Sequence, residues 1–184
     1  FYSDMYLNYE VFADSSAGYY SRIHQLGPTL TPIHRAFDID IKPGEDFPLE
    51  LKDKAFVGRC DLDNVIINYG GNWEKGYLRT RVKSFGDFVI MADTIPPDIQ
   101  VLNFGARHSP GQTLRFRISD NVTNGGSQRG LSYEGSIDGR WILMEYDVKN
   151  NLLTHLLASD MNRGTHSLLL RVTDAMGNST TLEQ

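Results

Sequence analysis

The chain has 184 residues and a formal net charge of -5. This length suits one large domain or two small ones, and a composition of 40% hydrophobic and 22% charged residues indicates a folded protein. Lysine and arginine are dispersed among aspartate and glutamate, so no basic surface for nucleic acid is expected. The single cysteine, Cys60, excludes an internal disulfide, and no apolar stretch approaches the ~20 residues that a membrane-spanning helix requires.

The beginning of the chain shows neither an initiator methionine nor a signal peptide. It opens with the polar and aromatic run Phe1-Tyr2-Ser3-Asp4. We therefore expect the chain to be a fragment of a longer or processed protein.

Alternation of apolar and polar residues recurs along the chain and predicts strands rather than helices. Residues 37–41 show the pattern clearly, because Phe37, Ile39 and Ile41 alternate with aspartates. Such alternation is typical of sheets with one buried face. In chain order, the predicted strands are residues 5–13, 37–41, 55–60, 65–69, 77–82, 88–92, 99–104, 114–119, 131–137, 141–146, 152–157 and 168–173.

Turn residues separate these strands. Asp138-Gly139 is a tight-hairpin signal, since both residue types tolerate the positive φ of a two-residue turn. Residues 70–72, 74–76, 149–151 and 176–178 resemble further turns. Residues 43–54 form a predicted loop with room for one helical turn, and residues 121–130 form a predicted Gly/Asn/Ser-rich loop.

Two consecutive prolines, Pro96 and Pro97, indicate a boundary near the midpoint. Proline cannot donate a hydrogen bond to a sheet ladder, so the pair predicts the exit from one sheet and the entry to another through a semi-rigid join. We therefore predict an all-β chain of two tandem β-sandwich domains, residues 1–94 and 95–184. The second is expected to be immunoglobulin-like.

The sequence offers few residues for catalysis or metal binding. His34 and Asp38 have the H-x-x-x-D spacing of some zinc hydrolases, but no H-x-H pair exists to supply a third ligand, and a polar strand face is the simpler interpretation. His108, His155 and His166 stand singly in or beside predicted loops. We predict no catalytic set, no metal and no cofactor for this chain.

Several aspartates follow predicted strands. Carboxylates gathered at strand ends can bind calcium at a domain junction, whereas the commoner role of such residues is to cap turns. No D-x-D-x-D-G loop is present, so turn capping is expected and junction calcium is the alternative. The residues concerned are Asp93, Asp98, Asp120, Asp138 and Asp174.

Aromatic residues beside turns are the candidate ligand-binding residues. Exposed rings at Trp73, Tyr19 and Tyr20 would form a stacking surface for a glycan or a peptide. This hypothesis requires the three rings to line one exposed surface. Trp141 is expected to lie in the core, because residues 142–146 continue a predicted strand.

A set of short motifs occurs in a distinctive order from about His34 to the end of the chain. The motifs include Gly70-Gly71-Asn72-Trp73, Asp93-Thr94-Ile95-Pro96-Pro97, Gly135-Ser136-Ile137-Asp138-Gly139-Arg140-Trp141 and Val172-Thr173-Asp174. In this respect the chain resembles the C-terminal, non-catalytic region of lysostaphin-like zinc endopeptidases of the Bacteroidetes. The first thirty or so residues carry no part of the resemblance.

The resemblance implies a non-catalytic accessory module of an exported protein of the periplasm or outer cell envelope. In such proteins an upstream peptidase domain cuts peptidoglycan, so the implied partners are that domain of the same chain, together with peptidoglycan or another glycan. The alternative is a glycan- or peptide-binding adhesion module that uses exposed aromatic residues. A metalloenzyme that uses His34 and Asp38 is the third hypothesis.

Overall fold

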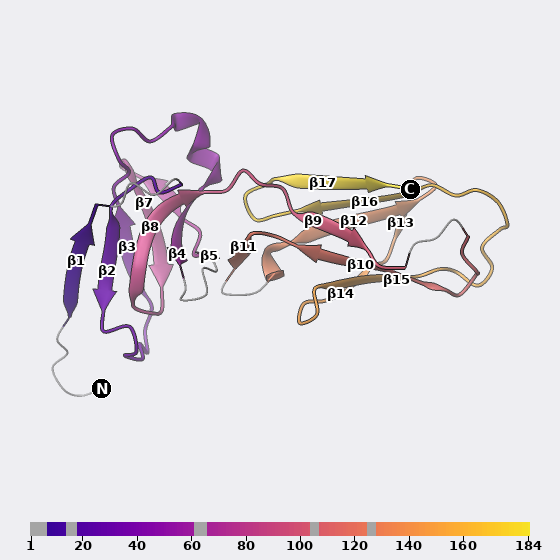
Figure 1. Ribbon diagram of the computed structural model, residues 1–184, viewed down its shortest axis with the longest axis horizontal. Coiled ribbons are helices and arrows are strands. Elements are labelled where there is room, and N and C mark those ends of the chain that lie inside the picture. The colour runs from indigo at the N-terminus through magenta and orange to yellow at the C-terminus, as the bar shows by residue number, and fades with distance from the viewer. Residues whose placement is uncertain (1–6, 14–17, 61–65, 104–106, 125–127) are drawn as a thin grey trace. The chain divides into compact units, whose positions relative to one another are not determined.

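The computed structural model describes residues 7–13, 18–60, 66–103, 107–124 and 128–184. Strands dominate these residues, and the helical segments are two short 3-10 helices, η1 (Leu49–Lys54) and η2 (Gln128–Gly130). The chain is therefore all-β, as predicted (Figure 1). Within the described part of the chain, no helix has the length and apolar character needed to cross a membrane.

The chain divides into two compact units. The first contains Phe1–Thr94 and Asn124–Gly126, and the second contains Ile95–Thr123 and Ser127–Gln184. The short strand β11 (Val122–Asn124) ends in the segment that is counted with the first unit. Each unit has its own buried apolar cluster.

The first unit contains a larger and a smaller antiparallel sheet. The larger sheet has, in spatial order, β1 (Asn8–Phe12), β2 (Ile23–Gly27), β8 (Gly86–Ala92), β4 (Ala55–Cys60) and β5 (Ile66–Asn68). The smaller sheet has the order β3 (Phe37–Ile41), β7 (Tyr77–Val82) and β6 (Asn72–Glu74). The edge strand β1 is exposed along its whole length.

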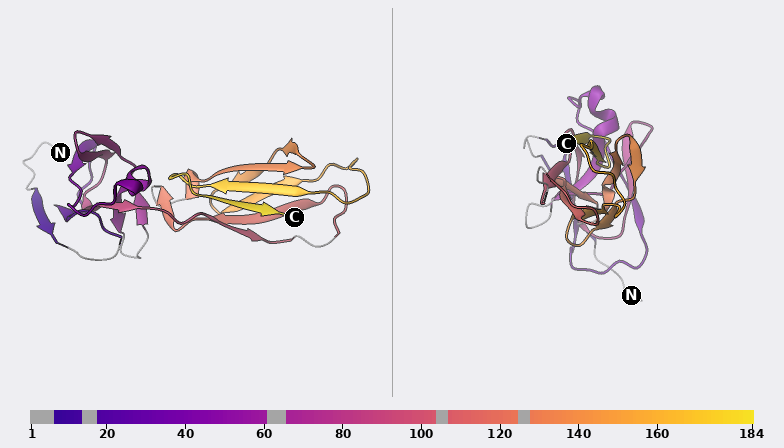
Figure 2. Two further views of the ribbon diagram at one scale, coloured as in Figure 1. Left: turned by 90° about the horizontal axis from the view of Figure 1, so that it is seen from above. Right: turned by 90° about the vertical axis from the view of Figure 1, so that its right-hand side faces the viewer.

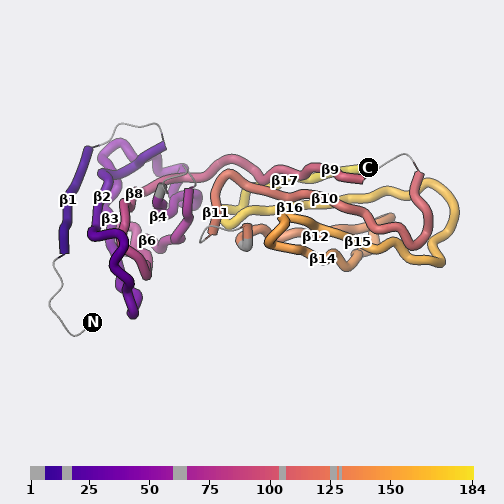
Figure 3. Tube along the Cα trace, turned by 60° about the horizontal axis from the view of Figure 1, so that its bottom comes forward, coloured from indigo at the N-terminus to yellow at the C-terminus, as the bar shows by residue number. Residues whose placement is uncertain are grey.

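These two sheets bury their apolar faces against each other. Leu78 and Val82 of β7 are buried at alternate positions, and they share one core cluster with Val57 of β4 and Phe88 and Ile90 of β8. Both sheets contribute to this cluster, so the first unit is a β-sandwich. The tube trace in Figure 3 follows β2, β3, β4 and β8 through this unit.

The second unit contains two four-stranded sheets whose long strands run in similar directions (Figure 2). One sheet has the order β14 (Glu145–Asp147), β15 (Leu152–Leu156), β10 (Thr113–Ser119) and β9 (Asp98–Val101). The other has the order β13 (Arg140–Ile142), β12 (Ser132–Ile137), β16 (Leu168–Thr173) and β17 (Ser179–Glu183). Immunoglobulin domains also divide their strands between two antiparallel sheets, and the immunoglobulin-like character of this unit stays a prediction.

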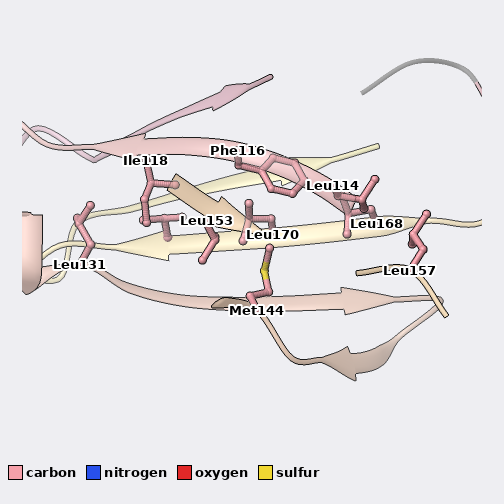
Figure 4. Packing of buried hydrophobic residues seen from close by; sticks show 10 residues of the cluster. Leu114, Phe116, Ile118, Leu131, Met144, Leu153, Leu157, Leu168 and Leu170 are labelled. Atoms are coloured by element: carbon pink, nitrogen blue, oxygen red, sulfur yellow. The ribbon is translucent and has the colours of Figure 1, made fainter. Parts of the chain in front are cut away.

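Side chains from both sheets meet in the core of the second unit (Figure 4). Phe116 of β10 and Leu153 of β15 come from one sheet, and Leu170 of β16 comes from the other. All three are 0% exposed. The second unit is therefore also a β-sandwich, with its core between the two sheets.

The strongest sequence patterns gave correct strands. The predicted strands 37–41, 55–60 and 77–82 coincide with β3, β4 and β7. The Asp138-Gly139 hairpin is also confirmed, with φ of 53° and 74° and with Ile137 paired to Arg140.

The predicted strand 141–146 is wrong. Its residues belong to two strands, since β13 joins one sheet and β14 joins the other. Buried Met144 lies where the chain passes between the two sheets. The sequence also missed four strands, β2, β6, β11 and β17, which are short or rich in polar residues.

Truncation of Phe116 should destabilise the second unit strongly. We expect Phe116→Ala to lower the free energy of unfolding by about 3–5 kcal/mol, because it leaves a cavity between two sheets. The matched control is Leu156→Ala in the neighbouring strand. Leu156 is 64% exposed, so its change should stay within about 0.5 kcal/mol. Urea unfolding of both variants measures the difference, and equal losses would contradict this account of the core.

Candidate functional site

Trp73 is held by contacts within the first unit. It lies on β6, and its indole nitrogen donates a hydrogen bond to the carbonyl of Lys52 at 3.0 Å. The ring centroid of Phe47 lies 5.4 Å from that of Trp73, and Lys52 Nζ lies 5.9 Å from the Trp73 ring. Trp73 is half-buried, and part of its surface packs against the core cluster of the unit. These contacts fix the orientation of the ring.

Tyr20, the second candidate residue, packs against the same Phe47 ring. Its ring lies edge-on to Phe47, with centroids 5.5 Å apart. The backbone of Tyr20 is fixed as well, because its N–H donates to the carbonyl of Ile90 at 2.8 Å and its carbonyl accepts from Gly44. Tyr19 forms an isolated β-bridge with Met91 and is half-buried.

The structure therefore brings Tyr20 and Trp73 together through Phe47. The backbones of Tyr19 and Tyr20 pair with residues of β8, an inner strand of the larger sheet. All three candidate rings are half-buried. Their packing gives Tyr20 and Trp73 a structural role, while ligand binding by the three residues stays a prediction.

The position of Trp141 differs from the one expected from the sequence. We expected this residue in the core, but it lies on the edge strand β13 and is 70% exposed. The reason is the strand register, in which Ile142 lies opposite Gly135 on the inner face and Trp141 lies opposite Ser136 on the outer face. This exposure leaves the indole available to a ligand, so Trp141 is a candidate for binding.

The outer face around Trp141 combines apolar and polar groups. Ser136 pairs with Trp141 on one side and with Leu169 of β16 on the other, so these three residues form one row across the sheet. Glu134 and Arg171 form the next row on the same face. We call these five outward side chains the Trp141 face. The sequence did not reveal this face, because apolar and polar residues do not alternate from Trp141 to Tyr146 and so do not show which side chains point outward.

The H-x-x-x-D pair shows the features of a polar strand face. His34 precedes β3 and is exposed, while Asp38 on β3 lies 3.9 Å from the guanidinium of Arg81. The same face carries a stronger contact, in which Arg79 contacts both carboxylate oxygens of Asp40 at 2.6 and 2.7 Å. This contact lowers the pKa of Asp40. Among the described residues, no third ligand joins His34 and Asp38 in a metal-binding group.

The remaining strand-end carboxylates have defined contacts. In the second unit, Asp174 accepts hydrogen bonds from the N–H groups of Met176 and Asn178, both at 2.8 Å, and from the Asn178 amide. Such contacts cap a turn. Its carboxylate oxygen lies within 4.8 Å of one from Asp120. In the first unit, buried Asp93 donates its N–H to the carbonyl of Lys54. Asp98 is exposed at the start of β9. Turn capping is thus the observed role of Asp174, and calcium binding at these aspartates stays the untested alternative.

The fifth aspartate, Asp138, forms an ion pair with His166. His166 Nδ1 lies 2.6 Å from the Asp138 carboxylate, and His166 Nε2 lies 2.9 Å from the carbonyl of Asn162. Both ring nitrogens thus face acceptors, which the doubly protonated ring satisfies with two N–H donors. The Asp138 hydrogen bond is the larger cause that raises the pKa of His166, and His166 in turn lowers the pKa of Asp138.

The first unit also has a hollow of 280 Å³ on the β1–β2 hairpin. Its lining consists of Asn8, Glu10, Gln25, Gly27, Pro28 and Thr29. Elsewhere on the hairpin, the hydroxyl of Tyr9 lies 2.8 Å from His24 Nδ1. Partial burial is the main cause that lowers the pKa of His24, and the charge of Arg22 adds to it.

The two tryptophans should respond differently to truncation. We expect Trp73→Ala to lower the free energy of unfolding by about 1–3 kcal/mol, because it removes apolar contact and a hydrogen-bond donor. Trp141→Ala should change it by less than about 0.5 kcal/mol. Urea unfolding followed by circular dichroism measures both values. A larger loss for Trp141→Ala would show that its exposed ring contributes to the fold.

The contact between His166 and Asp138 should make stability depend on pH. The pKa of His166 is raised, so its contribution is fully present below its ordinary pKa of 6.5 and is lost as the pH rises through the raised value. The pKa of Asp138 is lowered, so its contribution is present above its ordinary pKa of 3.8 and is lost on acidification through the lowered value.

This dependence can be measured by urea unfolding between pH 5 and pH 9. We expect His166→Gln to remove the decline in stability on the alkaline side, whereas His155→Gln serves as the matched control and should retain it. An NMR titration should give His166 a pKa above 6.5. A titration midpoint below this value would contradict the doubly protonated geometry.

No curated protein matches the chain. A family model described as the Zu5-like domain matches residues 1–93 of the 184, just over half of the chain and nearly all of the contiguous part of the first unit. We conclude that the chain belongs to the Zu5-like domain family.

Proposed function

We propose that this chain is a non-catalytic accessory module of an exported cell-envelope protein, where it positions a cell-wall endopeptidase domain of the same protein. The family resemblance in residues 34–184 supplies the envelope context. The observation that carries the mechanical part of the proposal is the short, anchored connection between the two units. Neither part of the proposal requires this chain to carry out a reaction.

The connection is fixed close to both of its ends. On one side, the N–H of buried Asp93 donates to the carbonyl of Lys54 at 3.0 Å. On the other side, Pro97 is buried, and its carbonyl accepts a hydrogen bond from Thr180 of β17. Residues 94–96 are the only ones between these anchors, and Pro96 restricts the backbone further. A short and stiff connection suits a spacer better than a flexible tether.

The contacts of three histidines support a non-catalytic role. His24 contacts a tyrosine hydroxyl, His155 contacts the carbonyl of Leu143, and His166 contacts a carboxylate and a carbonyl. A histidine that activates a side-chain nucleophile would instead face a serine, threonine or cysteine. None of these three histidines has such a partner in the contacts described above.

A glycan- or peptide-binding module is the second candidate function. The specific observation in its favour is Trp141, whose ring is 70% exposed on the outer face of a sheet. This location differs from the predicted surface of Trp73, Tyr19 and Tyr20. The two functions are compatible, because an accessory module can both position a domain and bind wall material.

The proposal is tested on the full-length gene product. Its sequence upstream of Phe1 should contain H-x-x-x-D followed by H-x-H, the zinc ligands of the implied peptidase. Deletion of the 184 residues should lower the hydrolysis of insoluble cell walls at least about tenfold, while hydrolysis of a short soluble peptide should change less than about twofold. Positioning affects access to the wall and leaves the chemical step unchanged.

Two results would overturn the proposal. The first is an upstream sequence without a peptidase. The second is an equal loss on both substrates in a deletion variant whose peptidase domain remains folded, since this would place the region in the chemical step.

A further inference from the structure

We propose that the Trp141 face binds a neutral oligosaccharide by stacking a sugar ring on the indole of Trp141. The site would lie on the sheet of β13, β12, β16 and β17, in the unit that the Zu5-like match does not cover. This inference rests on the second candidate function, binding at Trp141, and deepens it by naming the ligand class, whereas the accessory role needs no ligand on this surface.

The row leaves the indole accessible from solvent. Trp141 is 70% exposed, and its cross-strand neighbour Ser136 is small. Leu169 follows on the next strand and is 38% exposed. Neighbouring strands lie ~4.8 Å apart, so Trp141 and Leu169 are about 10 Å apart at their Cα atoms with only a hydroxymethyl group between them. The result is a shallow strip with one aromatic ring at the sheet edge.

The next row supplies hydrogen-bonding groups of both kinds. Glu134 on β12 pairs with Arg171 on β16, and Arg171 pairs with Thr181 on β17. All three are exposed, and they lie two residues along their strands from the first row, a distance of about 7 Å. Arg171 also contacts Ser179 Oγ at 3.4 Å, which holds the guanidinium near the sheet surface. Carboxylate, guanidinium and hydroxyl groups therefore border the aromatic strip.

This chemistry matches a sugar better than a charged polymer. A pyranose ring presents C–H groups on its faces and hydroxyl groups around its rim. The C–H groups fit against the electron-rich face of an indole, and each hydroxyl can both donate to Glu134 and accept from Arg171. Two carboxylates lie on this face of the sheet, Glu134 opposite Arg171 and Glu183 opposite Leu169. They outnumber the one cation, Arg171, so a polyanion would be repelled rather than attracted.

The apolar area is too small for a stable protein partner. A specific protein interface buries roughly 800 Å² on each side, of which a little over half is apolar, whereas one aromatic side chain supplies only about 150–250 Å². Trp141 and Leu169 are the large apolar side chains of the Trp141 face. One aromatic ring and a polar border are enough for a small ligand that stacks and hydrogen-bonds.

Fluorescence offers a direct test on the complete 184-residue protein. The chain has two tryptophans, so the Trp73→Phe variant makes Trp141 the single emitter. The probes are chitotetraose and cellotetraose, two neutral β-linked oligosaccharides. We expect millimolar concentrations of at least one probe to shift the Trp141 emission to shorter wavelength and to protect it from acrylamide quenching. Circular dichroism verifies that the variant is folded.

Calorimetric titration of the unmodified protein then locates the site. We expect Trp141→Ala to weaken binding at least about tenfold, which corresponds to about 1.4 kcal/mol. Leu156→Ala is the matched control, because Leu156 is an apolar residue of similar exposure (64%) on the other sheet of the unit and should leave affinity within about twofold. Glu134→Gln should weaken binding by a smaller factor, since it removes one charged acceptor next to the ring.

These experiments support or overturn oligosaccharide binding by Trp141, and they do not test the accessory role. Loss of binding in Trp141→Ala, with retention in Leu156→Ala, supports this inference. No protection of Trp141 by either oligosaccharide overturns it, as does binding that survives Trp141→Ala. The accessory role is tested on the full-length protein with wall and peptide substrates, so either hypothesis can fail without the other.

Discussion

The strand register of β12 decides which side chains of the second unit reach solvent. Gly135 lies opposite Ile142 and Leu170 on the inner face, so the next row, which contains Trp141, Ser136 and Leu169, must face outward. A shift by one residue would exchange the two faces. Gly135 also makes room for the core, because a Cβ at this position would lie 2.6 Å from the sulfur of Met144. The pairing of β12 with β13 and β16 therefore determines both which side chains form the core and which lie on the outer face.

The sequence predicted strands best where alternation is regular. Residues 77–82 alternate between exposed and buried positions over their full length, and the predicted strand has the observed bounds. The strand β17, with the sequence STTLE, offers mostly hydroxyl and acidic side chains, so its pairing with β16 comes from tertiary structure. The break between β13 and β14 was also hidden, because a run of apolar residues does not reveal where the chain changes sheets.

The contacts at the candidate sites could be predicted from sequence even less well than the strands. Asp138 could be predicted as a turn residue, because its role in the Asp-Gly hairpin is local. Its contact with His166, 28 residues further along the chain, depends on the loop after β15 and could not be inferred from spacing. The aromatic candidates divide similarly. Trp73 and Tyr20 meet through Phe47, which no local pattern indicates, while the exposure of Trp141 depends on its cross-strand partner.

The edge strand β1 has a consequence for how copies of this protein meet. Its five residues are exposed, and Tyr9, Val11 and Phe12 are large and apolar, which is the composition that invites pairing with another strand. Glu10 lies at the centre of β1 and is its only charged residue. Antiparallel pairing of two copies about this centre would place one Glu10 directly opposite the other, and like charges in that position destabilise a ladder. The carboxylate of Glu10 thus disfavours the symmetric antiparallel pairing of two copies through β1.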